Sequence, residues 1–322
     1  MKTILVTGGA GFIGSNFIRY IINKYDDYRI INLDALTYAG NLDNLNNIKD
    51  NPNYVFVKGD ISDIDTVNKI MEKGVDYIIN FAAESHVDRS IDSSNAFIKT
   101  NVMGTQVLLD AAKKYKIKKY IQISTDEVYG SLGETGYFTE KTPISPNNPY
   151  SASKASADLL VRAYYETYKL PINITRCSNN YGAYQYPEKL IPLMISRAYD
   201  NQPLPVYGNG LNIRDWIHVE DHCAAIDKVL HHGKIGEVYN IGANNERNNL
   251  FIVRKILDCL DKDESLIEFV DDRLGHDVRY AIDATKIREE LGWRPSYKFE
   301  EGIEETIRWY VNNQEWWRKI MK

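Results

Sequence analysis

The chain has 322 residues and a formal net charge of −5, with 43% hydrophobic and 26% charged residues. That composition is typical of a globular protein with room for a large α/β domain and a smaller one, and it lacks the basic stripe typical of nucleic-acid binding. Its three cysteines have no CxxC spacing and no apolar run reaches the length of a membrane span, so we expect reduced thiols, no metal site, no membrane anchor and a cytoplasmic location.

The first half of the chain alternates short apolar runs with amphipathic helical patterns. Strands are predicted over 3–6, 29–33, 54–57, 77–81, 120–123 and 172–175. Helices are predicted over 12–25, 62–73, 96–115 and 151–168. Continuous apolar strands between helices favour a parallel sheet covered on both faces, and right-handed crossovers make it a doubly wound Rossmann sheet.

After about residue 176 the alternation breaks down, and Pro, Gly, Asn and Tyr become frequent. Helices are predicted here over 188–199, 219–231, 249–260, 284–291 and 299–312. We therefore expect an α/β protein with a Rossmann domain over 1–176 and a smaller, mixed α/β domain over 177–322. The strand over 238–241 is a candidate to return to the main sheet, and His231 and His232 are expected on a plain helix surface.

A glycine motif lies between the first strand and the first helix. Gly8, Gly11 and Gly14 allow a tight turn and let the backbone approach a pyrophosphate at the helix N-terminus. Asp34 follows Gly14 by 20 residues, at the end of the second strand. A carboxylate at that position hydrogen-bonds ribose hydroxyls and repels a 2′-phosphate, which favours NAD over NADP. Asp60, after the third strand, is predicted to flank the adenine or to cap the next helix.

A tyrosine and a lysine are four residues apart at the start of a predicted helix. This spacing places Tyr150 and Lys154 on one helix face. Tyrosine has an ordinary pKa near 10, but a neighbouring ammonium and a positive nicotinamide ring favour the phenolate, which can act as a base. The pair is therefore a candidate for proton and hydride chemistry beside a nicotinamide.

Two adjacent acids follow the fifth predicted strand. Asp126 and Glu127 come directly after Thr125, at the carboxyl end of a parallel strand, where open α/β sheets bind ligands. If their surroundings separate their pKa values, one acts as an acid and the other as a base. Capping of a helix is the structural alternative for this pair.

Several strings identify a family resemblance that runs from residue 1 to beyond 310. TGGAGFIG over 7–14, YSASK over 150–154 and the strand-end Ser124-Thr125 resemble the extended short-chain dehydrogenase/reductase superfamily. Narrower strings resemble the dTDP-glucose 4,6-dehydratases, namely DALTYAGN (34–41), AAESHVDRS (82–90), STDEVYG (124–130), RCSNNYG (176–182), PEKLIP (187–192), NIRDW (212–216) and GHD (275–277). The aspartate of the acid pair is the sharpest sign, because related epimerases and decarboxylases typically lack it.

The resemblance implies a reaction without net redox change. Tyr150 is expected to take the proton of the glucose 4-hydroxyl while hydride passes from C4 to NAD⁺, with Thr125 bonded to the 4-oxygen and Lys154 on the ribose. The ketone acidifies C5, so Glu127 is expected to remove the C5 proton and Asp126 to protonate the departing 6-hydroxyl. Hydride then returns to C6 and gives the 4-keto-6-deoxy sugar.

The resemblance also implies two sets of binding residues. Beside Tyr150 and Lys154, the NAD site is expected to include Gly8, Gly11, Phe12, Ile13, Gly14, Asp34, Leu36, Thr37, Asp60, Ile61, Ala82, Ala83, Ser85, Asn101 and Asn180. Beside Thr125, the nucleotide sugar is expected to contact His86, Asn179, Lys189, Leu190, Pro205, Tyr207, Arg214, Asn249, Asp272, Arg273 and His276. Arg214 and Arg273 suit the diphosphate, because guanidinium groups bind such oxygens in a bidentate manner. A surface ion pair for Arg214 and a structural role for His86 are the alternatives.

Two positions depart from the family pattern. Ala183 stands where the family often has proline, and Val278 where it often has a second arginine. The missing arginine bears on phosphate contacts, and thymidine differs from uridine by one methyl group, worth only ~1 kcal/mol in a pocket. The same reaction on UDP-glucose is therefore an alternative.

Two other functions compete with dehydration. A nucleotide-sugar 4-epimerase would also use Tyr150 and Lys154 but would need no acid pair. A silent NAD-binding regulator would need none of these groups. The resemblance also implies a homodimer, for which the helices over 96–115 and 151–168 are candidates. Their apolar residues Leu159, Leu160 and Ala163 fit such an interface, and the alternative is that they face the sheet.

Overall fold

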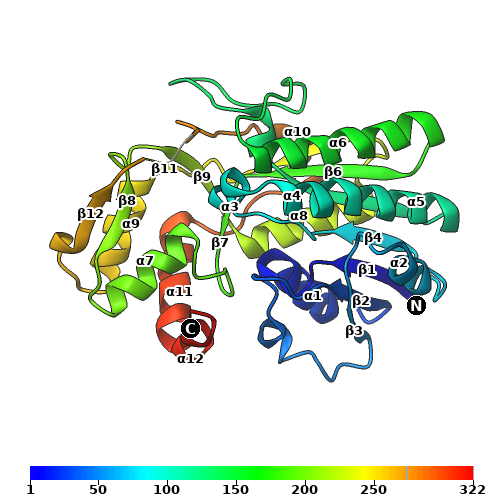
Figure 1. The fold of residues 1–322 in the computed structure, drawn as a ribbon, viewed down its shortest axis with the longest axis horizontal. Helices are drawn as coiled ribbons and strands as arrows, with labels where there is room; N and C mark the ends of the chain where they lie inside the picture. The colour runs from blue at the N-terminus through cyan, green and yellow to red at the C-terminus, as the bar shows by residue number, and fades with distance from the viewer. Residues whose placement is uncertain (273–274, 322) are drawn as a thin grey trace.

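A seven-stranded parallel sheet forms the centre of the computed structural model, which describes residues 1–272 and 275–321 (Figure 1). The spatial order is β10-β6-β5-β4-β1-β2-β3, so the chain reverses direction across the sheet between β1 and β4. The strands are β1 (Lys2–Thr7), β2 (Tyr28–Asp34), β3 (Tyr54–Lys58), β4 (Tyr77–Asn80), β5 (Lys119–Thr125), β6 (Ile172–Cys177) and β10 (Val238–Ile241). The predicted doubly wound α/β sheet is confirmed, and its switch point lies where such sheets bind ligands.

Helices cover both faces of this sheet. Because successive strand residues point to opposite faces, Ile4 and Val6 pack against one helix layer and Leu5 against the other. The first layer contains α1 (Phe12–Lys24), α8 (Val219–His232) and α10 (Thr285–Leu291). The second contains α2 (Ile64–Met71), α5 (Thr105–Tyr115) and α6 (Pro149–Tyr168). The short helices α3 (Val87–Asp92) and α4 (Asn95–Phe97) precede η2, a π-helix (Ile98–Gly104) that leads into α5.

A smaller lobe lies beyond the carboxyl edge of the sheet, on the left in Figure 1. It contains a three-stranded and a two-stranded sheet, and its own core includes Trp216, Phe299 and Trp317. Its strands are β7 (Asn179–Tyr181), β8 (Leu204–Tyr207), β9 (Ile213–His218), β11 (Glu246–Asn248) and β12 (Ile267–Val270). Its helices are α7 (Leu190–Tyr199), α9 (Asn249–Cys259), α11 (Phe299–Asn312) and α12 (Gln314–Ile320).

The structure differs from the sequence prediction in several elements. The helix predicted over 188–199 begins at Leu190, and the long helix predicted over 96–115 is interrupted by the π-helix η2. The helices α3 and α12 and the short strands of the small lobe were not predicted, because each is too short to show a hydrophobic period. Strand β10 pairs with β6 in the main sheet, although the chain has already entered the small lobe.

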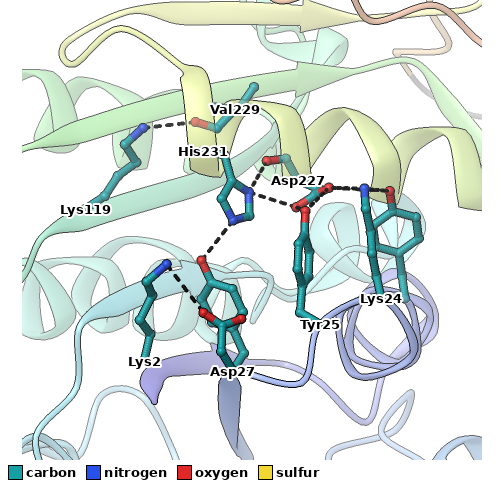
Figure 2. A network of polar contacts seen from close by, with 10 residues as sticks. Lys2, Lys24, Tyr25, Asp27, Lys119, Asp227, Val229 and His231 are labelled. Atoms are coloured by element: carbon teal, nitrogen blue, oxygen red, sulfur yellow. Dashed lines mark hydrogen bonds and ion pairs between the residues drawn. The ribbon is translucent and has the colours of Figure 1, made fainter.

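A polar network joins α1 to α8 on one face of the sheet (Figure 2). Asp227 accepts hydrogen bonds from Lys24 at 2.7 Å and from Tyr25 at 3.0 Å, and its carboxylate lies 2.9 Å from Nδ1 of His231. The other ring nitrogen of His231 lies 2.8 Å from the hydroxyl of Tyr28. The expectation that His231 lies on a plain helix surface is therefore wrong, because the end of α1 and the start of β2 lie against this turn of α8.

Candidate active site

The turn between β1 and α1 is built from glycines that pack too closely for side chains. Gly8 has a φ of 66°, and a Cβ there would lie 2.6 Å from the nitrogen of Ala82. A Cβ on Gly14 would lie 2.4 Å from the carbonyl oxygen of Gly8. Helix α1 begins with no side-chain cap and no acid in its first turn, which leaves its N–H groups for an anion. This cradle fits the pyrophosphate of NAD.

Asp34 lies beside the glycine turn at the end of β2. Its carboxylate accepts hydrogen bonds from the N–H of Ala10 at 2.9 Å and of Leu36 at 2.8 Å. Burial raises the pKa of this carboxyl, and the two N–H groups oppose that rise. The neighbouring helix α2 is capped by Asp63, so the alternative that Asp60 caps it is wrong, and Asp60 lines the pocket.

One pocket gathers most of the predicted site residues at the carboxyl edge of the sheet. From the cofactor set it is lined by Gly8, Gly11, Phe12, Ile13, Gly14, Asp34, Thr37, Asp60, Ile61, Ala82, Ala83, Ser85 and Asn180. The lining also includes the predicted catalytic residues and two of the substrate set, namely Thr125, Asp126, Glu127, Tyr150, Lys154, Asn179 and Lys189. Outside it lie Leu36, His86, Asn101, Leu190, Pro205, Tyr207, Arg214, Asn249, Asp272 and His276. Arg273 lies outside the described residues.

The two acids begin a single turn of 3-10 helix, η3 (Asp126–Tyr129), directly after β5. The hydroxyl of Thr125 accepts from the N–H of Glu127 at 3.2 Å and donates to Oδ1 of Asp126 at 3.3 Å. Asp126 is 1% exposed, and its Oδ2 has no hydrogen-bond partner among the described residues. Burial, with the adjacent Glu127, raises the pKa of Asp126 well above its ordinary value. The raised pKa favours the protonated form of this carboxyl, which is the form that a general acid needs.

Tyr150 and Lys154 occupy the first turns of α6. Asn148 and Ser151 form a capping box around Pro149, which fixes the start of this helix and turns Tyr150 into the pocket. Burial, then the charge of Glu127, raises the pKa of Tyr150 well above 10. The ammonium of Lys154 donates to the carbonyl oxygen of Ile123 at 2.6 Å, and burial lowers its pKa. These surroundings favour the phenol, so the positive charge that favours a phenolate has to come with the cofactor.

Asn101 lies behind the pocket wall, within the π-helix η2. Its side chain bonds both backbone groups of Glu84, at 2.9 and 3.0 Å, and donates to the hydroxyl of Ser153 at 2.8 Å. It therefore braces the segment after β4 against α6. A π-helical turn at this point is consistent with a functional site, where such turns are frequent.

The predicted sugar-nucleotide residues of the small lobe form a second group around the β8–β12 sheet. Nδ1 of His276 lies 2.6 Å from Oδ1 of Asp272, and its ring lies 6.3 Å from that of Tyr207. Arg214 on β9 is 5% exposed, donates to the carbonyl oxygen of Asp277 at 3.0 Å and stacks over the ring of Tyr280. Its burial argues against a surface ion pair.

Pro205 lies on β8, Leu190 opens α7 and Asn249 opens α9, all in the small lobe. His86 occupies the N-cap position of α3 without a side-chain cap, and its Nε2 lies 3.5 Å from the carboxylate of Glu188, which lines the pocket. His86 and Leu190 therefore adjoin residues that line the pocket, Ser85 and Lys189, whereas Pro205 and Asn249 are placed only by their small-lobe elements.

The chain matches a family model described as GDP-mannose 4,6 dehydratase over residues 5–306. It is 52% identical to a dTDP-glucose 4,6-dehydratase of Xanthomonas campestris pv. campestris (strain B100), over 100% of this chain and 96% of that protein. The chain belongs to the dTDP-glucose 4,6-dehydratase family. The family predicted from the sequence is therefore confirmed.

Solved structures of this family have the same fold. The dTDP-glucose 4,6-dehydratase of Bacillus anthracis str. Ames, in complex with NAD, is 56% identical with a TM-score of 0.94, over 99% of this chain and 100% of that one. The enzyme DesIV of Streptomyces venezuelae, with NAD and TYD bound, is 48% identical with a TM-score of 0.96, over 99% of both chains.

Neither of the two departures from the dehydratase pattern lines the pocket that holds the acid pair. The carbonyl oxygen of Ala183 accepts from Nδ2 of Asn16 on α1 at 3.0 Å, and a proline at 183 would keep that carbonyl. The side chain of Val278 is 63% exposed, and its N–H donates to the hydroxyl of Ser131.

Sequence reasoning missed several residues that line the pocket of this dehydratase-family chain. Tyr38 and Glu188 are two polar residues among them, and each lies inside a string that carried the resemblance. Tyr38 stacks under the guanidinium of Arg89, at 3.9 Å from its ring centre, and Arg89 lies 3.5 Å from Glu188. Their positions in those strings were the available signal.

Two features are absent from the part of the chain that the structure describes. No group of three or more His, Cys, Asp or Glu residues is arranged to hold a metal ion. No helix has the length and apolar character needed to cross a membrane.

Proposed function

We propose that the protein uses NAD to dehydrate dTDP-glucose to dTDP-4-keto-6-deoxyglucose, as a hydro-lyase of its family. Membership of the family supports this reaction, and the two solved relatives with bound NAD support the cofactor. The observation that carries the proposal is the acid pair Asp126–Glu127 in the same pocket as Tyr150. An enzyme that only moves hydride needs the tyrosine, whereas loss of water from a hexose also needs an acid and a base.

The first half of the reaction belongs to Tyr150. When bound, NAD⁺ takes the hydride from C4 of the sugar, returns it to C6, and brings the positive ring that favours the phenolate of Tyr150. The phenolate takes the proton of the 4-hydroxyl, which turns C4 into a ketone. Lys154, four residues along α6, orients the ribose.

The second half belongs to the acid pair. The 4-ketone acidifies C5, so Glu127 removes the C5 proton, and Asp126 donates its proton to the 6-hydroxyl, which leaves as water. The proton on Glu127 exchanges with solvent, and Glu127 then delivers a proton to C5 as hydride reaches C6. The proton that Tyr150 holds then restores Asp126, so the enzyme ends the cycle as it began. The raised pKa of Asp126 supports its role as the acid.

We assign NAD binding mainly to residues 1–176 and nucleotide-sugar binding mainly to residues 177–322. The grouping of Tyr207, Asp272 and His276 beside the β8–β12 sheet supports this division. Asn179 and Lys189, which line the pocket where the small lobe begins, would lie between the sugar and its nucleotide. UDP-glucose remains the alternative substrate, because the two nucleotides differ by a single methyl group.

The deciding experiment incubates purified protein with dTDP-glucose and UDP-glucose in parallel. Dehydration gives a 4-keto sugar that absorbs strongly in alkali and has lost one water by mass spectrometry, whereas a 4-epimerase gives an isomer of unchanged mass. A silent NAD-binding regulator would leave both sugars unchanged.

A deuterium experiment tests the assigned roles. In D₂O the wild type should place deuterium at C5, Glu127→Gln should abolish that uptake, and Tyr150→Phe should slow C4 oxidation by about 10²–10⁴-fold. Unchanged turnover in both variants would contradict the mechanism.

We also propose a homodimer and a cytoplasmic location. Exposed apolar side chains support the dimer on the outer face of α6 and of the π-helix that packs beside it: Leu159 is 53% exposed, Ile98 47% and Met103 55%. Large exposed apolar side chains that gather on one face are typical of an interface.

A further inference from the structure

Ala10 lies in the middle of the glycine turn, and both its N–H and its carbonyl oxygen form hydrogen bonds. Its N–H donates to Asp34 at 2.9 Å. Its carbonyl oxygen accepts from the N–H of Asn41 at 3.0 Å and from Nδ2 of Asn44 at 2.9 Å. Ala10 and Asn44 are 0% and 2% exposed, so water does not replace these bonds. The shape of the turn that receives the pyrophosphate therefore depends on the orientation of the Asn44 amide.

That orientation is fixed by the C-terminal helix. The indole Nε1 of Trp316, on α12, donates to Oδ1 of Asn44 at 2.9 Å. If the amide rotated by half a turn, its NH₂ would face the indole N–H, and its oxygen would face the carbonyl of Ala10. Both contacts would then be repulsive, because an indole nitrogen only donates and a carbonyl only accepts. Trp316 thus holds Asn44 in the one orientation that supports the turn.

Helix α12 is itself anchored in the small lobe. Trp317 is 2% exposed and donates to the carbonyl oxygen of Tyr310 on α11, and Gln314 donates to the hydroxyl of Tyr199 on α7. The segment over 41–45, which holds the carbonyl of Ala10 through hydrogen bonds, is here called the cofactor loop. A second link to this loop is the hydrogen bond from the ammonium of Lys319 to Asp43, at 2.5 Å. The last helix of the chain therefore connects the small lobe to the turn at its beginning.

We propose that Asn44 and Trp316 are positioning residues for NAD, through which the C-terminal helix holds the pyrophosphate turn in its binding shape. Neither residue lines the pocket. They act through Ala10, whose neighbours Gly8, Gly11 and Phe12 do line it. The inference rests on NAD as the cofactor of the proposed reaction, and not on the identity of the sugar.

The test compares two conservative variants of adjacent tryptophans. Trp316→Phe keeps an aromatic ring against Tyr184 and Trp309 but removes the N–H that reaches Asn44. Trp317→Phe is the matched control, because it removes one indole hydrogen bond from the same helix without touching the cofactor loop. For each holoenzyme, gel filtration and chromatography of the released nucleotide measure the rate of NAD release. Calorimetry measures the NAD dissociation constant, and the melting temperature is measured on protein freed of NAD.

Trp316→Phe should raise the NAD dissociation constant about fivefold, as expected for the loss of one buried hydrogen bond. Trp317→Phe should leave it within about twofold while lowering the melting temperature. A second variant, Asn44→Asp, keeps the acceptor for Trp316 but loses the donor to Ala10, and should weaken NAD binding at least as much as Trp316→Phe. If Asn44→Asp does not fold, the tryptophan pair still decides.

Two results would overturn the inference. One is an unchanged NAD dissociation constant in Trp316→Phe, and the other is an equal change in both tryptophan variants, which would mean a purely structural helix. The outcome is separable from the proposed function, because NAD binding is measured without any sugar.

Discussion

Asp126 and Glu127 are neighbours in sequence, yet their positions suit opposite tasks. Asp126 is buried and has its pKa raised, which favours the protonated acid. We expect Asp126→Asn to keep C4 oxidation and to slow release of water by about 10²–10⁴-fold. Reduced nicotinamide should then accumulate on the enzyme, which its ultraviolet absorbance would report.

Glu140→Gln is the control for that variant, because Glu140 is another acid whose pKa is raised by burial and which lies outside the pocket lining. Its Oε1 accepts from the N–H of Asn240, and glutamine keeps that acceptor. Normal product formation in Asp126→Asn, or an equal loss in Glu140→Gln, would rule out Asp126 as the acid.

The raised pKa of Asp126 lowers the stability of the folded protein at higher pH. Its pKa is higher in the folded than in the unfolded chain, so the folded state is destabilised as pH rises above the ordinary aspartate value near 4. Asparagine stays neutral, so Asp126→Asn should raise the melting temperature, and by more at pH 8 than at pH 5. Scanning calorimetry at the two pH values checks this, and a destabilised variant at pH 8 would contradict it.

At the scale of elements, the glycine turn and α1 approach each other too closely for a methyl group at Gly14. A Cβ there meets backbone at 2.4 Å, so Gly14→Ala must displace the start of α1. We expect a loss of about 1–3 kcal/mol in unfolding free energy and NAD binding weakened about tenfold or more. Gly133→Ala is the control, since its Cβ meets nothing within 4 Å. Calorimetric NAD titration of both variants would separate them, and equal NAD constants would contradict the steric argument.

The contact between α1 and α8 predicts a second pH effect. The hydrogen bond to Asp227 raises the pKa of His231, whose ring also faces Tyr28, while Lys2 and Lys24 lie nearby. The stabilisation that this hydrogen bond gives the folded state is complete below about pH 6.5, the pKa of histidine in the unfolded chain. It is lost as pH rises through the higher pKa of His231 in the folded state. His231→Gln should therefore lower the melting temperature, relative to the wild type, by more at pH 6 than at pH 9.

His232→Gln provides the comparison for that network, because His232 is the exposed neighbour on the same turn. Thermal denaturation across the pH range should show a pH-dependent difference for His231→Gln alone. If the difference in melting temperature from the wild type does not change with pH in either variant, His231 does not carry the proposed charge in the folded state.

At the scale of the whole molecule, the outer face of α6 predicts an assembly. A glutamate in place of Leu159, which is 53% exposed there, should turn the proposed dimer into a monomer. Phe269→Glu, at a 58% exposed position on β12 of the small lobe, should leave the dimer intact. Light scattering after gel filtration measures both, and a monomeric wild type would contradict the interface.

The sequence predicted the cofactor half of the molecule better than the other half, for a physical reason. The glycines, Asp34 and the Tyr150–Lys154 pair act within single turns or at strand ends, so their spacing along the chain is enough to place them. Arg214 lies on β9, Asn249 opens α9 and His276 lies outside any helix or strand, so they meet only through packing of the small lobe, and no local period marks them. Helix α12 could not be related to the turn at Ala10, since its indole donor is 306 positions away in the chain.

The place of β10 in the main sheet has a consequence for synthesis of the chain. Ile241 of a 322-residue polypeptide must leave the ribosome before the edge of β6 is covered. Until then the nascent chain exposes unpaired backbone of β6, which can recruit a strand from another chain. A fragment ending at residue 176 should therefore aggregate instead of forming an independent NAD-binding unit, whereas one that extends beyond β10 should remain dispersed.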